Sequence, residues 1–583
     1  MELLDSRRLT GPNLLLDRPG AILEVALSPE EAETAVAAWA AQARRMLDAV
    51  GWTGAEIAAR RFPGGASLAI TAPIDGLYTA TEINDWAWEA AETAVTGREA
   101  PDFRSAAARL RDEIAREANP ALLALQAGAA AHRVAFLADD RAVSLGLGKG
   151  SLTWPARALP DPAEVDWSKV HDIPVLLVTG TNGKTTTVRL LAALVDASEQ
   201  MAGTTSTDVI EVGGEVIERG DFSGPGGART LLRDRRVEVA ILETARGGLL
   251  RRGLAVDRAD AALVTNIAAD HLGEFGILDL PALAAAKLVV ARAVGPRGRI
   301  VLNADDPELV AAAGSLRSPI LWLSLDPRNP LVRRALDAGG EACFCDGRSL
   351  VLARGGERIE VATVDRIPVT FGGAARHNVA NALAAVAMAS AIGVPADAMA
   401  TGLRRFGTRP EDNPGRANLF ERDGFRVLVD YAHNPHGLAA LLEVVRSLPA
   451  ERRLLLLGHA GDRDDAALRD LARAALPFEP DRIVLKELPE MLRGRQPGEV
   501  PAILEDELRR QGFPAERIEH AGSELEGVRK ALAEARPGDL LILLVHTQRE
   551  EVLEAVGAAG PPGDQSPGYA SNEKPSEPGS PKS

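Results

Sequence analysis

The sequence has two cysteines, few lysines and no long apolar run. Cys343 and Cys345 lie two residues apart in the strand-like segment EACFCDG, where a disulfide is geometrically poor and two thiols alone cannot complete a zinc site. No apolar stretch approaches the roughly 18 residues that a membrane span needs, and the start MELLDSRRLTGPN has no signal-peptide pattern. We therefore expect a protein of the reducing cytoplasm that does not cross a membrane.

The charge balance is acidic, with 82 acidic against 66 basic residues and a formal net charge of −16. Such a chain has no overall electrostatic attraction for nucleic acid or for an anionic membrane surface, so neither is expected as a partner. Its 583 residues, 46% of them hydrophobic, are enough for several domains, each with its own core.

Lysine is scarce: of the 66 basic residues only 8 are lysines, and the others are arginines. Three of them, Lys184, Lys287 and Lys486, lie beside sequence patterns that carry chemistry. A compact ammonium that sits among phosphates, or an amine that reacts, cannot be replaced by arginine. These three lysines are therefore candidate functional residues.

The chain divides into four predicted segments. Residues 1–160 mix strand-like runs with helical patterns such as SPEEAETAVAAWAAQARRML and predict an α+β domain, which ends in a polar, proline-bearing connector. Residues 161–409 alternate strands with helices, as a parallel α/β sheet does, and include a hairpin-like edge appendage. Residues 410–557 predict a smaller Rossmann-like α/β domain, and residues 558–583, rich in Pro, Gly and Ser, predict a disordered tail.

The segment LLVTGTNGKTTTVRLL places a glycine-punctuated turn between an apolar strand and an aliphatic helix. Gly180 and Gly183 let backbone N–H groups turn inward, while Lys184 offers a charge to the β- and γ-phosphates of a nucleotide and Thr185 a hydroxyl to Mg²⁺. The usual P-loop has its first glycine six residues before the lysine, where this chain has Val178. The loop predicts a phosphate-binding site of a distinct class, and a glycine turn with a surface lysine is the alternative.

Two later strands end in polar side chains, which parallel strands would bring to the same sheet edge. The strand in VEVAILETARGG ends at Glu243, a carboxylate that could bind Mg²⁺. The strand in VTNIAADHLGEFG is followed by Asn266, Asp270 and His271, and His271 could contact metal or phosphate. A solvated glutamate and a structural histidine are the alternatives.

Six spaced motifs occur in one order over roughly residues 170 to 556: TGTNGKTTT, LETARGG, TNIAADHLG, LNADDP, ARHNVANALAA and VDYAHNP. Together they resemble the Mur ligase family, which comprises the ATP-dependent amide ligases of peptidoglycan synthesis, folylpolyglutamate synthetase and the Mur-like half of cyanophycin synthetase. The wording of PGRANLFERDGFRVLVDYAHNPHGL and LKELPEMLRGRQPGEV is most similar to the cyanophycin synthetase branch. RRLTGPNLL and DGLYTATEINDWAWEAA resemble the N-terminal domain of that branch.

The resemblance implies a role for each position that matches the family motifs. The implied ATP-binding residues are Gly180, Thr181, Asn182, Gly183, Lys184, Thr185, Thr186, Asn378, Asn381, Arg416, Asp430 and His433. The two asparagines of RHNVAN would lie on the adenine side. Asp430 and His433, together with Tyr431 of the same motif, would come from a C-terminal domain that closes over the nucleotide.

The resemblance also implies two Mg²⁺ ions and a set of catalytic residues. The implied metal ligands are Thr185, Glu243, His271 and Lys287, and the implied catalytic residues are Lys184, Glu243, His271, Lys287 and Arg416. Lys287 matches a lysine that several family members carry as a carbamate, an amine turned into a metal-bridging carboxylate. For Lys287, a solvated helix residue is the alternative.

The implied reaction makes an amide at the expense of ATP. A substrate carboxylate attacks the γ-phosphate to give an acyl phosphate, and an amine then displaces phosphate through a tetrahedral intermediate. The cyanophycin branch implies an aspartate-type carboxylate, on a peptide or polymer, and arginine or a similar amino acid as the amine. A peptidoglycan- or folate-type ligase and a catalytically silent ATP-binding scaffold are the alternatives. No pattern specifies an oligomeric state, so a homo-oligomer stays open.

Two features of the sequence limit or extend this reading. Only 22 residues separate Gly150 from Ile173, whereas the ATP-grasp domain that cyanophycin synthetase has there needs about two hundred. Synthesis of the usual polymer by this chain alone is therefore not expected. In addition, LKELPEMLRGRQPGE contains Lys486, Glu487, Arg493 and Arg495 and is either a substrate-facing or a solvated charged loop.

Overall fold

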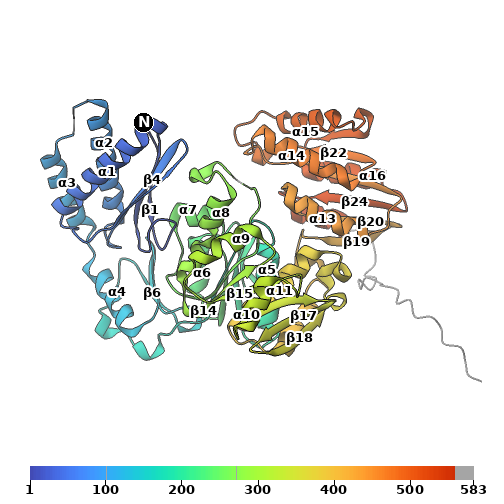
Figure 1. Cartoon of the computed structure of the whole chain (residues 1–583), viewed down its shortest axis with the longest axis horizontal. Coiled ribbons are helices and arrows are strands. Elements are labelled where there is room, and N and C mark those ends of the chain that lie inside the picture. The colour runs from blue at the N-terminus through green and yellow to red at the C-terminus, as the bar shows by residue number, and fades with distance from the viewer. Residues whose placement is uncertain (100, 271, 558–583) are drawn as a thin grey trace, which may run out of the picture. The chain divides into compact units, whose positions relative to one another are not determined.

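The computed structural model describes residues 1–99, 101–270 and 272–557 and falls into two compact units (Figure 1). Unit 1 comprises Met1–Phe406, Ala432–Leu448 and Arg463–Phe478. Unit 2 comprises Gly407–Tyr431, Pro449–Asp462 and the chain from Glu479 onward. His271 and the predicted disordered tail lie outside the described residues. Within the described ranges, no helix combines the length and the apolar character needed to cross a membrane.

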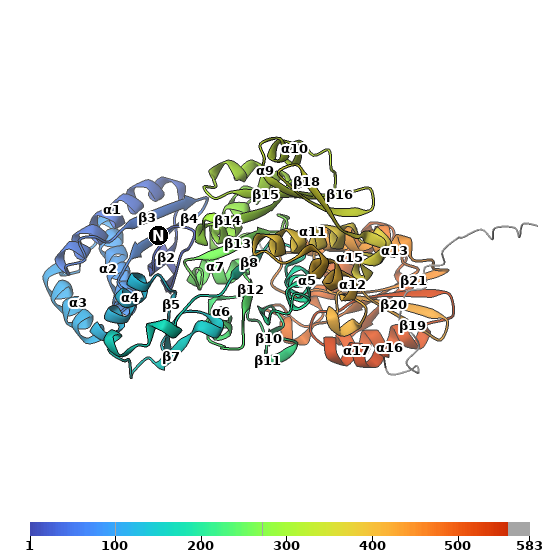
Figure 2. The same ribbon diagram turned by 90° about the horizontal axis from the view of Figure 1, so that it is seen from below.

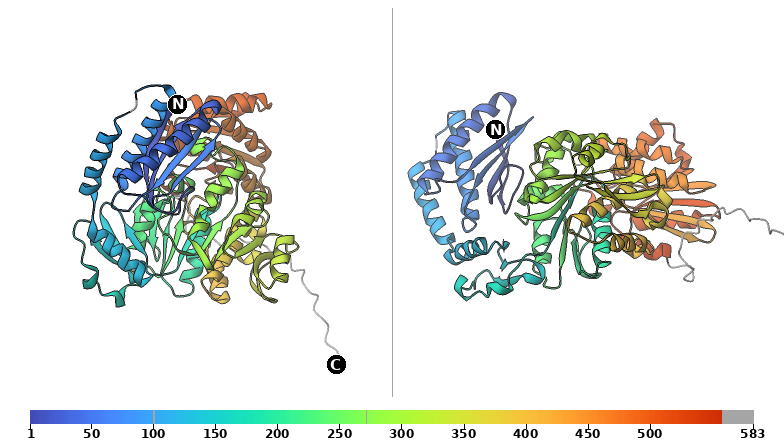
Figure 3. Two further views of the ribbon diagram at one scale, coloured as in Figure 1. Left: turned by 60° about the vertical axis from the view of Figure 1, so that its left-hand side comes forward. Right: turned by 60° about the horizontal axis from the view of Figure 1, so that its bottom comes forward.

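Unit 1 begins with an antiparallel sheet of order β1-β2-β4-β3, covered on one face by two long helices (Figure 3). The backbone N–H of Ser28 donates to the Glu31 carboxylate at 3.1 Å, as the helix-entry pattern predicts. Leu23, Leu68 and Trp39 lie in the core between sheet and helices. The elements are β1 (Glu2–Leu9), β2 (Gly20–Ala26), α1 (Pro29–Ala49), β3 (Ile57–Phe62), β4 (Gly65–Thr71), α2 (Leu77–Thr96) and α3 (Phe103–Glu117).

The connector after this region is packed rather than loose. Val165 and Val170 are buried in a small core with α4 (Pro120–His132) and a three-stranded sheet, and the Trp167 ring stacks on His132 at 4.1 Å. The strands of this small sheet are β5 (Phe136–Ala138), β6 (Ala142–Leu145) and β7 (Leu152–Pro155).

The centre of unit 1 is a large sheet of order β11-β10-β9-β12-β8-β13-β14-β15-β16-β17-β18. Among the described residues, the strands from β9 to β16 in this order pair in parallel, and antiparallel hairpin strands extend both edges. The predicted parallel sheet with an edge appendage is therefore confirmed. The strands are β8 (Val175–Thr179), β9 (Ala202–Thr205), β10 (Val209–Val212), β11 (Glu215–Arg219), β12 (Val239–Glu243), β13 (Ala259–Val264), β14 (Val294–Asn303), β15 (Ile320–Ser324), β16 (Glu341–Asp346), β17 (Ser349–Arg354) and β18 (Glu357–Thr363).

Both faces of this sheet are covered, because successive residues of its strands point to opposite sides. Leu176 and Val178 join a core with α5 (Lys184–Asp196), α11 (Arg376–Ala391) and α12 (Ala396–Arg405), which lie close together in Figure 2. The alternating residues of the same strand join the core of the opposite face. The helices on that face are α6 (Pro225–Leu232), α7 (Arg246–Arg252), α8 (Leu280–Lys287), α9 (Pro307–Ala312) and α10 (Pro330–Asp337).

Unit 2 contains a second, smaller sheet of order β19-β20-β24-β21-β22-β23, whose strands are parallel except β19. This mainly parallel sheet agrees with the predicted Rossmann-like α/β fold of this part of the chain. Its elements are β19 (Asn418–Arg422), β20 (Phe425–Asp430), β21 (Arg452–Leu457), β22 (Arg482–Lys486), α15 (Glu499–Arg510), β23 (Ile518–Ala521), α16 (Glu524–Glu534), β24 (Asp539–Leu544) and α17 (Arg549–Gly557). Helices α13 (Pro435–Ser447) and α14 (Asp465–Ala475) belong to unit 1, so the predicted segment boundaries stay predictions.

Candidate functional site

The glycine turn between β8 and α5 has a backbone that only glycine adopts readily. Gly180 and Gly183 have φ of 145° and 85°. A Cβ atom on Gly180 would lie 1.8 Å from the Thr265 hydroxyl oxygen, and one on Gly183 would lie 2.4 Å from the side-chain oxygen of Asn381. Conformation and close neighbours therefore both require glycine at these two positions.

The turn is held in place by the residues that follow β13. The backbone N–H groups of Thr181 and Asn182 donate to the backbone and side-chain oxygens of Asn266 at 2.9 and 3.0 Å. The Asn266 side-chain amide and the Thr265 hydroxyl both donate back to the Asn182 carbonyl, at 3.0 and 2.7 Å. Asn266, predicted only as a polar residue at the sheet edge, is thus a structural support of the loop.

Lys184 and Thr185 open helix α5 directly after this turn. The Lys184 ammonium folds back over the loop and donates to the Thr181 carbonyl at 3.0 Å. The Thr185 hydroxyl donates to the Glu243 carboxylate at 2.8 Å, and both side chains are buried. Thr207, which no sequence signal singled out, lies 3.3 Å from the Thr185 hydroxyl.

The contact between Thr185 and Glu243 unites two of the four predicted metal ligands. A hydroxyl and a carboxylate are hard oxygen donors of the kind that Mg²⁺ prefers, so this pair fits such an ion. Among the residues that the structure describes, no three His, Cys, Asp or Glu side chains form a group that could hold a metal ion. The third predicted ligand, His271, lies outside the described residues.

Lys287, the fourth predicted ligand, is buried at the end of α8 and donates to the Gly180 carbonyl at 2.8 Å. Burial lowers the pKa of its amine well below the ordinary value, and the nearby Lys184 charge lowers it further. The alternative of a solvated helix residue is therefore wrong.

A further polar group surrounds Asp270, next to the same loop. Asp270 accepts from the Arg463 guanidinium at 2.9 Å, and the predicted site residue His433 lies 3.7 Å from its carboxylate. Two residues in and directly after the motif VDYAHNP were missed in the sequence reading. The Asn434 side-chain amide donates to the Asn182 side chain at 3.1 Å, and His436 lies 2.8 Å from that side chain.

Asn378 and Asn381, predicted on the adenine side of a nucleotide, are both buried in the first turns of α11. The Asn381 side-chain amide donates to the Asn378 side chain at 3.0 Å, and that of Asn378 donates to the Val369 carbonyl at 2.8 Å. These bonds fix the two side chains, and the close approach of Asn381 to Gly183 places them next to the glycine turn. Contact with adenine stays a prediction.

The predicted residues of unit 2 form a group of their own. The Arg416 guanidinium lies 4.7 Å from the centre of the Tyr431 ring, and the Asp430 carboxylate accepts from the Ala417 backbone N–H at 2.8 Å. The Tyr431 ring meets the His546 ring edge-on at 5.4 Å. The Arg416 guanidinium thus lies over the face of an aromatic ring.

The sequence predicted that Lys486 lies in a charged loop, either facing a substrate or solvated. The structure shows neither position. Lys486 is the last residue of β22, is fully buried and forms an ion pair with Glu524. The Glu524 carboxylate also accepts from the backbone N–H groups of His546, Thr547 and Gln548. The pair therefore fixes the loop that follows β24, and Lys486 cannot face a substrate.

The rest of that segment is also tied down in part. Glu487 is buried and accepts from the Gly498 backbone N–H at 2.5 Å, and Arg495 donates to Glu499 at 2.6 Å. Arg493 is exposed. For Arg493 alone, a substrate-facing position and a solvated position both stay open.

The fold and the loop define an α/β protein with a glycine turn between a parallel strand and a helix, and comparison with known proteins identifies its family. The Mur ligase middle domain matches residues 178–389, and the Mur ligase glutamate ligase domain matches residues 415–544. The diaminopimelate-adding ligase of Gloeobacter violaceus, UDP-N-acetylmuramoyl-L-alanyl-D-glutamate–2,6-diaminopimelate ligase, is 30% identical over 375 residues, which are 63% of this chain and 70% of that protein. The chain therefore belongs to the Mur ligase family, as the six motifs predicted.

Other relatives match this chain over different shares of their own length. Cyanophycin synthetase of Synechocystis sp. is 38% identical over 391 residues, which are 67% of this chain and 44% of that protein. The chain thus spans less than half of the cyanophycin synthetases that it matches. Among solved structures, E. coli FolC in complex with DHPP and ADP has a TM-score of 0.49 at 21% identity, over 66% of this chain and 89% of that one. The likeness of the N-terminal region to cyanophycin synthetase stays a prediction.

The buried pair of Lys486 and Glu524 leads to a stability prediction. Lys486→Met leaves a buried carboxylate without its cation, so the free energy of unfolding, measured by urea denaturation, should fall by about 3–5 kcal/mol. Lys530→Met removes a partly exposed lysine of the adjoining helix α16 and should change stability little. Equal effects of the two substitutions would show that Lys486 is not a buried ion-pair partner.

Proposed function

We propose that this chain is an ATP-dependent amide ligase that activates a substrate carboxylate as an acyl phosphate and joins it to the amine of an amino acid. The hydrogen bond between Thr185 and Glu243 carries this proposal. It puts two oxygens of the kind that Mg²⁺ prefers beside the Lys184 loop, where two adjacent parallel strands end. Open α/β sheets bind their ligands at that edge.

The glycine turn and Lys184 would bind the ATP phosphates. Backbone N–H groups of the turn and the start of α5 offer donors and a positive helix end to an anion. The Lys184 ammonium, now bonded to the Thr181 carbonyl, would exchange this neutral acceptor for the β- and γ-phosphate oxygens. A charged acceptor makes the stronger hydrogen bond, so the exchange is favourable.

Thr185 and Glu243 would hold one Mg²⁺, and we assign His271 and Lys287 to a second. Bound magnesium would offset the charge that develops on the transferred phosphoryl group. We assign Arg416, held over Tyr431, to the ATP phosphates by its match to the family motif.

The reaction itself needs no covalent protein intermediate. A carboxylate oxygen of the acceptor attacks the γ-phosphorus, and the bond from that phosphorus to ADP breaks. The amine nitrogen then attacks the acyl carbon, and the tetrahedral adduct loses phosphate as the amine gives up a proton. Positioning and charge stabilisation supply most of the catalysis in such transfers, which suits the charged loop residue Lys184 and the assigned metal ligands.

The relatives suggest the substrates. The 38% identity to cyanophycin synthetase supports an aspartate-type carboxylate, on a peptide or polymer, and arginine or a similar amino acid as the amine. A diaminopimelate-type peptidoglycan ligase is the second candidate, favoured by a relative of which this chain covers 70%. A catalytically silent scaffold would have no need of the buried pair of Thr185 and Glu243.

Substrate-dependent ATP turnover tests this proposal. The full chain is incubated with ATP, Mg²⁺, aspartate peptides or UDP-linked muramoyl peptides as acceptors, and arginine, lysine or diaminopimelate as amines. We expect ADP and phosphate only when acceptor and amine are both present, most rapidly with an aspartate peptide and arginine, together with a product of the mass of the amide. Lys184→Ala should lower kcat/KM by about a hundredfold or more, because it removes a charge from the phosphate site.

Lys149→Ala is the matched control, because it removes a half-exposed lysine on the same unit. It should leave turnover within twofold of the unsubstituted chain. If no pair of substrates stimulates ADP formation, or if Lys184→Ala turns over ATP as fast as Lys149→Ala, the ligase proposal fails.

The state of Lys287 can be tested directly. Only a neutral amine adds CO₂, and the lowered pKa of Lys287 supplies one nearer neutral pH than an ordinary lysine does. Its carbamate would still have the N–H that the Gly180 carbonyl accepts. We therefore expect a carbamate signal in ¹³C NMR with labelled bicarbonate, stronger as the pH rises and missing in Lys287→Met. A spectrum that is the same for both proteins would contradict the assignment.

A further inference from the structure

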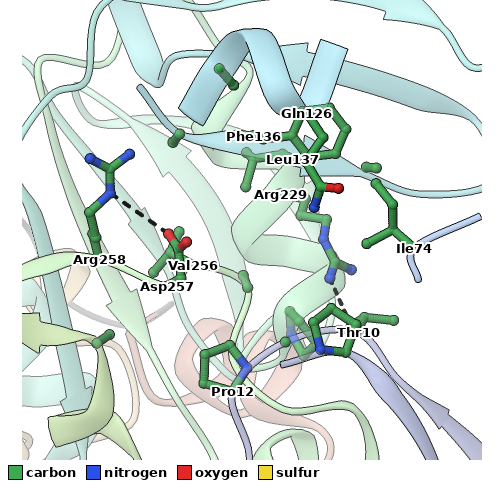
Figure 4. Close-up of a pocket in the computed structure, with 18 of the residues that line it drawn as sticks. Thr10, Pro12, Ile74, Gln126, Phe136, Leu137, Arg229, Val256, Asp257 and Arg258 are labelled. Atoms are coloured by element: carbon green, nitrogen blue, oxygen red, sulfur yellow. Dashed lines mark hydrogen bonds and ion pairs between the residues drawn. The ribbon is translucent and has the colours of Figure 1, made fainter. Parts of the chain in front are cut away.

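Unit 1 contains a cavity of about 1490 Å³ far from the glycine turn (Figure 4). Its walls come from α4, β5 and α6 and from the start of the chain, and its floor includes the first residues of β8, β13 and β14. Val175, the first residue of β8, lines it, whereas Gly180 follows the last residue of that strand. A five-residue strand spans about 16 Å. The cavity therefore lies at the amino ends of the parallel strands, and the glycine turn lies at their carboxyl ends.

Arg229, on α6, lies in this cavity with 8% of its surface exposed. Its guanidinium donates to the Thr10 hydroxyl at 2.7 Å, as Figure 4 shows. Within the described parts of the chain it forms no ion pair with a carboxylate. Burial lowers the pKa of this guanidinium, although arginine stays charged at neutral pH. A buried cation that is bonded only to a neutral hydroxyl is costly and is stabilised by an anion.

The carboxylates near Arg229 are already bound to other cations. Asp139 accepts from Arg233 at 2.6 Å, and Asp140 lies 3.3 Å from Arg8. Arg252, at the end of α7, lines the same cavity and donates to the Arg8 backbone carbonyl at 3.2 Å. Over the described residues, Arg252 also has no carboxylate partner. The Arg229 end of the cavity thus contains two cations with which no carboxylate of residues 1–99, 101–270 or 272–557 forms an ion pair.

The other parts of the cavity differ from this end. Ile74, Phe136 and Leu137 line it near Arg229 and offer apolar surface (Figure 4). Across the cavity, Arg258 lies 3.9 Å from the Asp257 carboxylate, so that cation is already paired. An anion is therefore attracted to the Arg229 end, and an apolar portion of the same molecule can lie against the neighbouring wall.

We propose that this cavity binds a small organic anion whose carboxylate or phosphate group accepts hydrogen bonds from Arg229 and is attracted by Arg252. Arginine matches both groups because its planar donors can bond two oxygens at once. The site is separate from the glycine turn, and its occupation requires neither ATP nor catalysis. Its presence can therefore be decided whether or not the ligase proposal holds.

Calorimetric titration tests this site. Phenyl phosphate and phenylacetate, each an anion with an apolar ring, are titrated separately into the full chain carrying Lys184→Ala, so that phosphate binding at the glycine turn does not contribute. We expect one saturable site for at least one probe, and the probe that binds tells phosphate from carboxylate. Arg229→Gln added to this background should weaken binding at least tenfold, and Arg252→Gln should weaken it severalfold.

The matched control is Arg328→Gln, which removes the same charge from an exposed arginine outside the cavity and should leave affinity within twofold. Circular dichroism checks that each variant is folded. If Arg229→Gln does not fold, the affinity of the Arg252→Gln variant decides the outcome, because Arg252 is exposed and its substitution should not disturb folding. The proposal is wrong if neither probe binds saturably at millimolar concentration. It is also wrong if the folded cavity variants bind as tightly as Arg328→Gln.

Discussion

The parallel pairing of β8 with β12 is the constraint on which the proposed site depends. Glu243 pairs with Val178 across this ladder, so its carboxylate lies where the glycine turn leaves β8 and meets the Thr185 hydroxyl at 2.8 Å. The turn itself is fixed by β13 on the other side of β8, through Thr265 and Asn266. Three adjacent strands thus determine the position of a single loop, and a slip of one residue in the ladder of β8 and β12 would separate the two oxygens.

Much of this arrangement could be predicted from the sequence because its determinants are local. The run from Leu176 to Lys184 specifies strand, turn and helix by itself, and the ends of parallel strands meet at one edge. The support of the loop could not be predicted in this way. Lys287 reaches the Gly180 carbonyl from 107 residues further along the chain, and its apolar neighbours do not tell which group its amine meets. Thr207 gave no signal, since a threonine after a short strand is common.

Lys486 shows where a local pattern misleads. Its position between an apolar run and a charged stretch suggests the start of a loop, yet its ammonium is buried against Glu524. Residues 38 apart decide this, and only the packing of α16 beside β22 brings them together. The two ends of β8 also differ in whether a local sequence pattern reveals a site. One end has a recognisable motif, whereas the cavity at the other end is lined by scattered residues with no motif in common.

The central claim is that Thr185 and Glu243 bind a metal ion that holds the nucleotide phosphates. Equilibrium titration of the full chain with a non-hydrolysable ATP analogue, with and without Mg²⁺, tests it most directly. The account predicts that Mg²⁺ tightens binding by about tenfold or more, roughly 1.4 kcal/mol, and that Glu243→Gln loses this increment while keeping the affinity measured without Mg²⁺. An equal Mg²⁺ increment in Glu243→Gln would contradict the account.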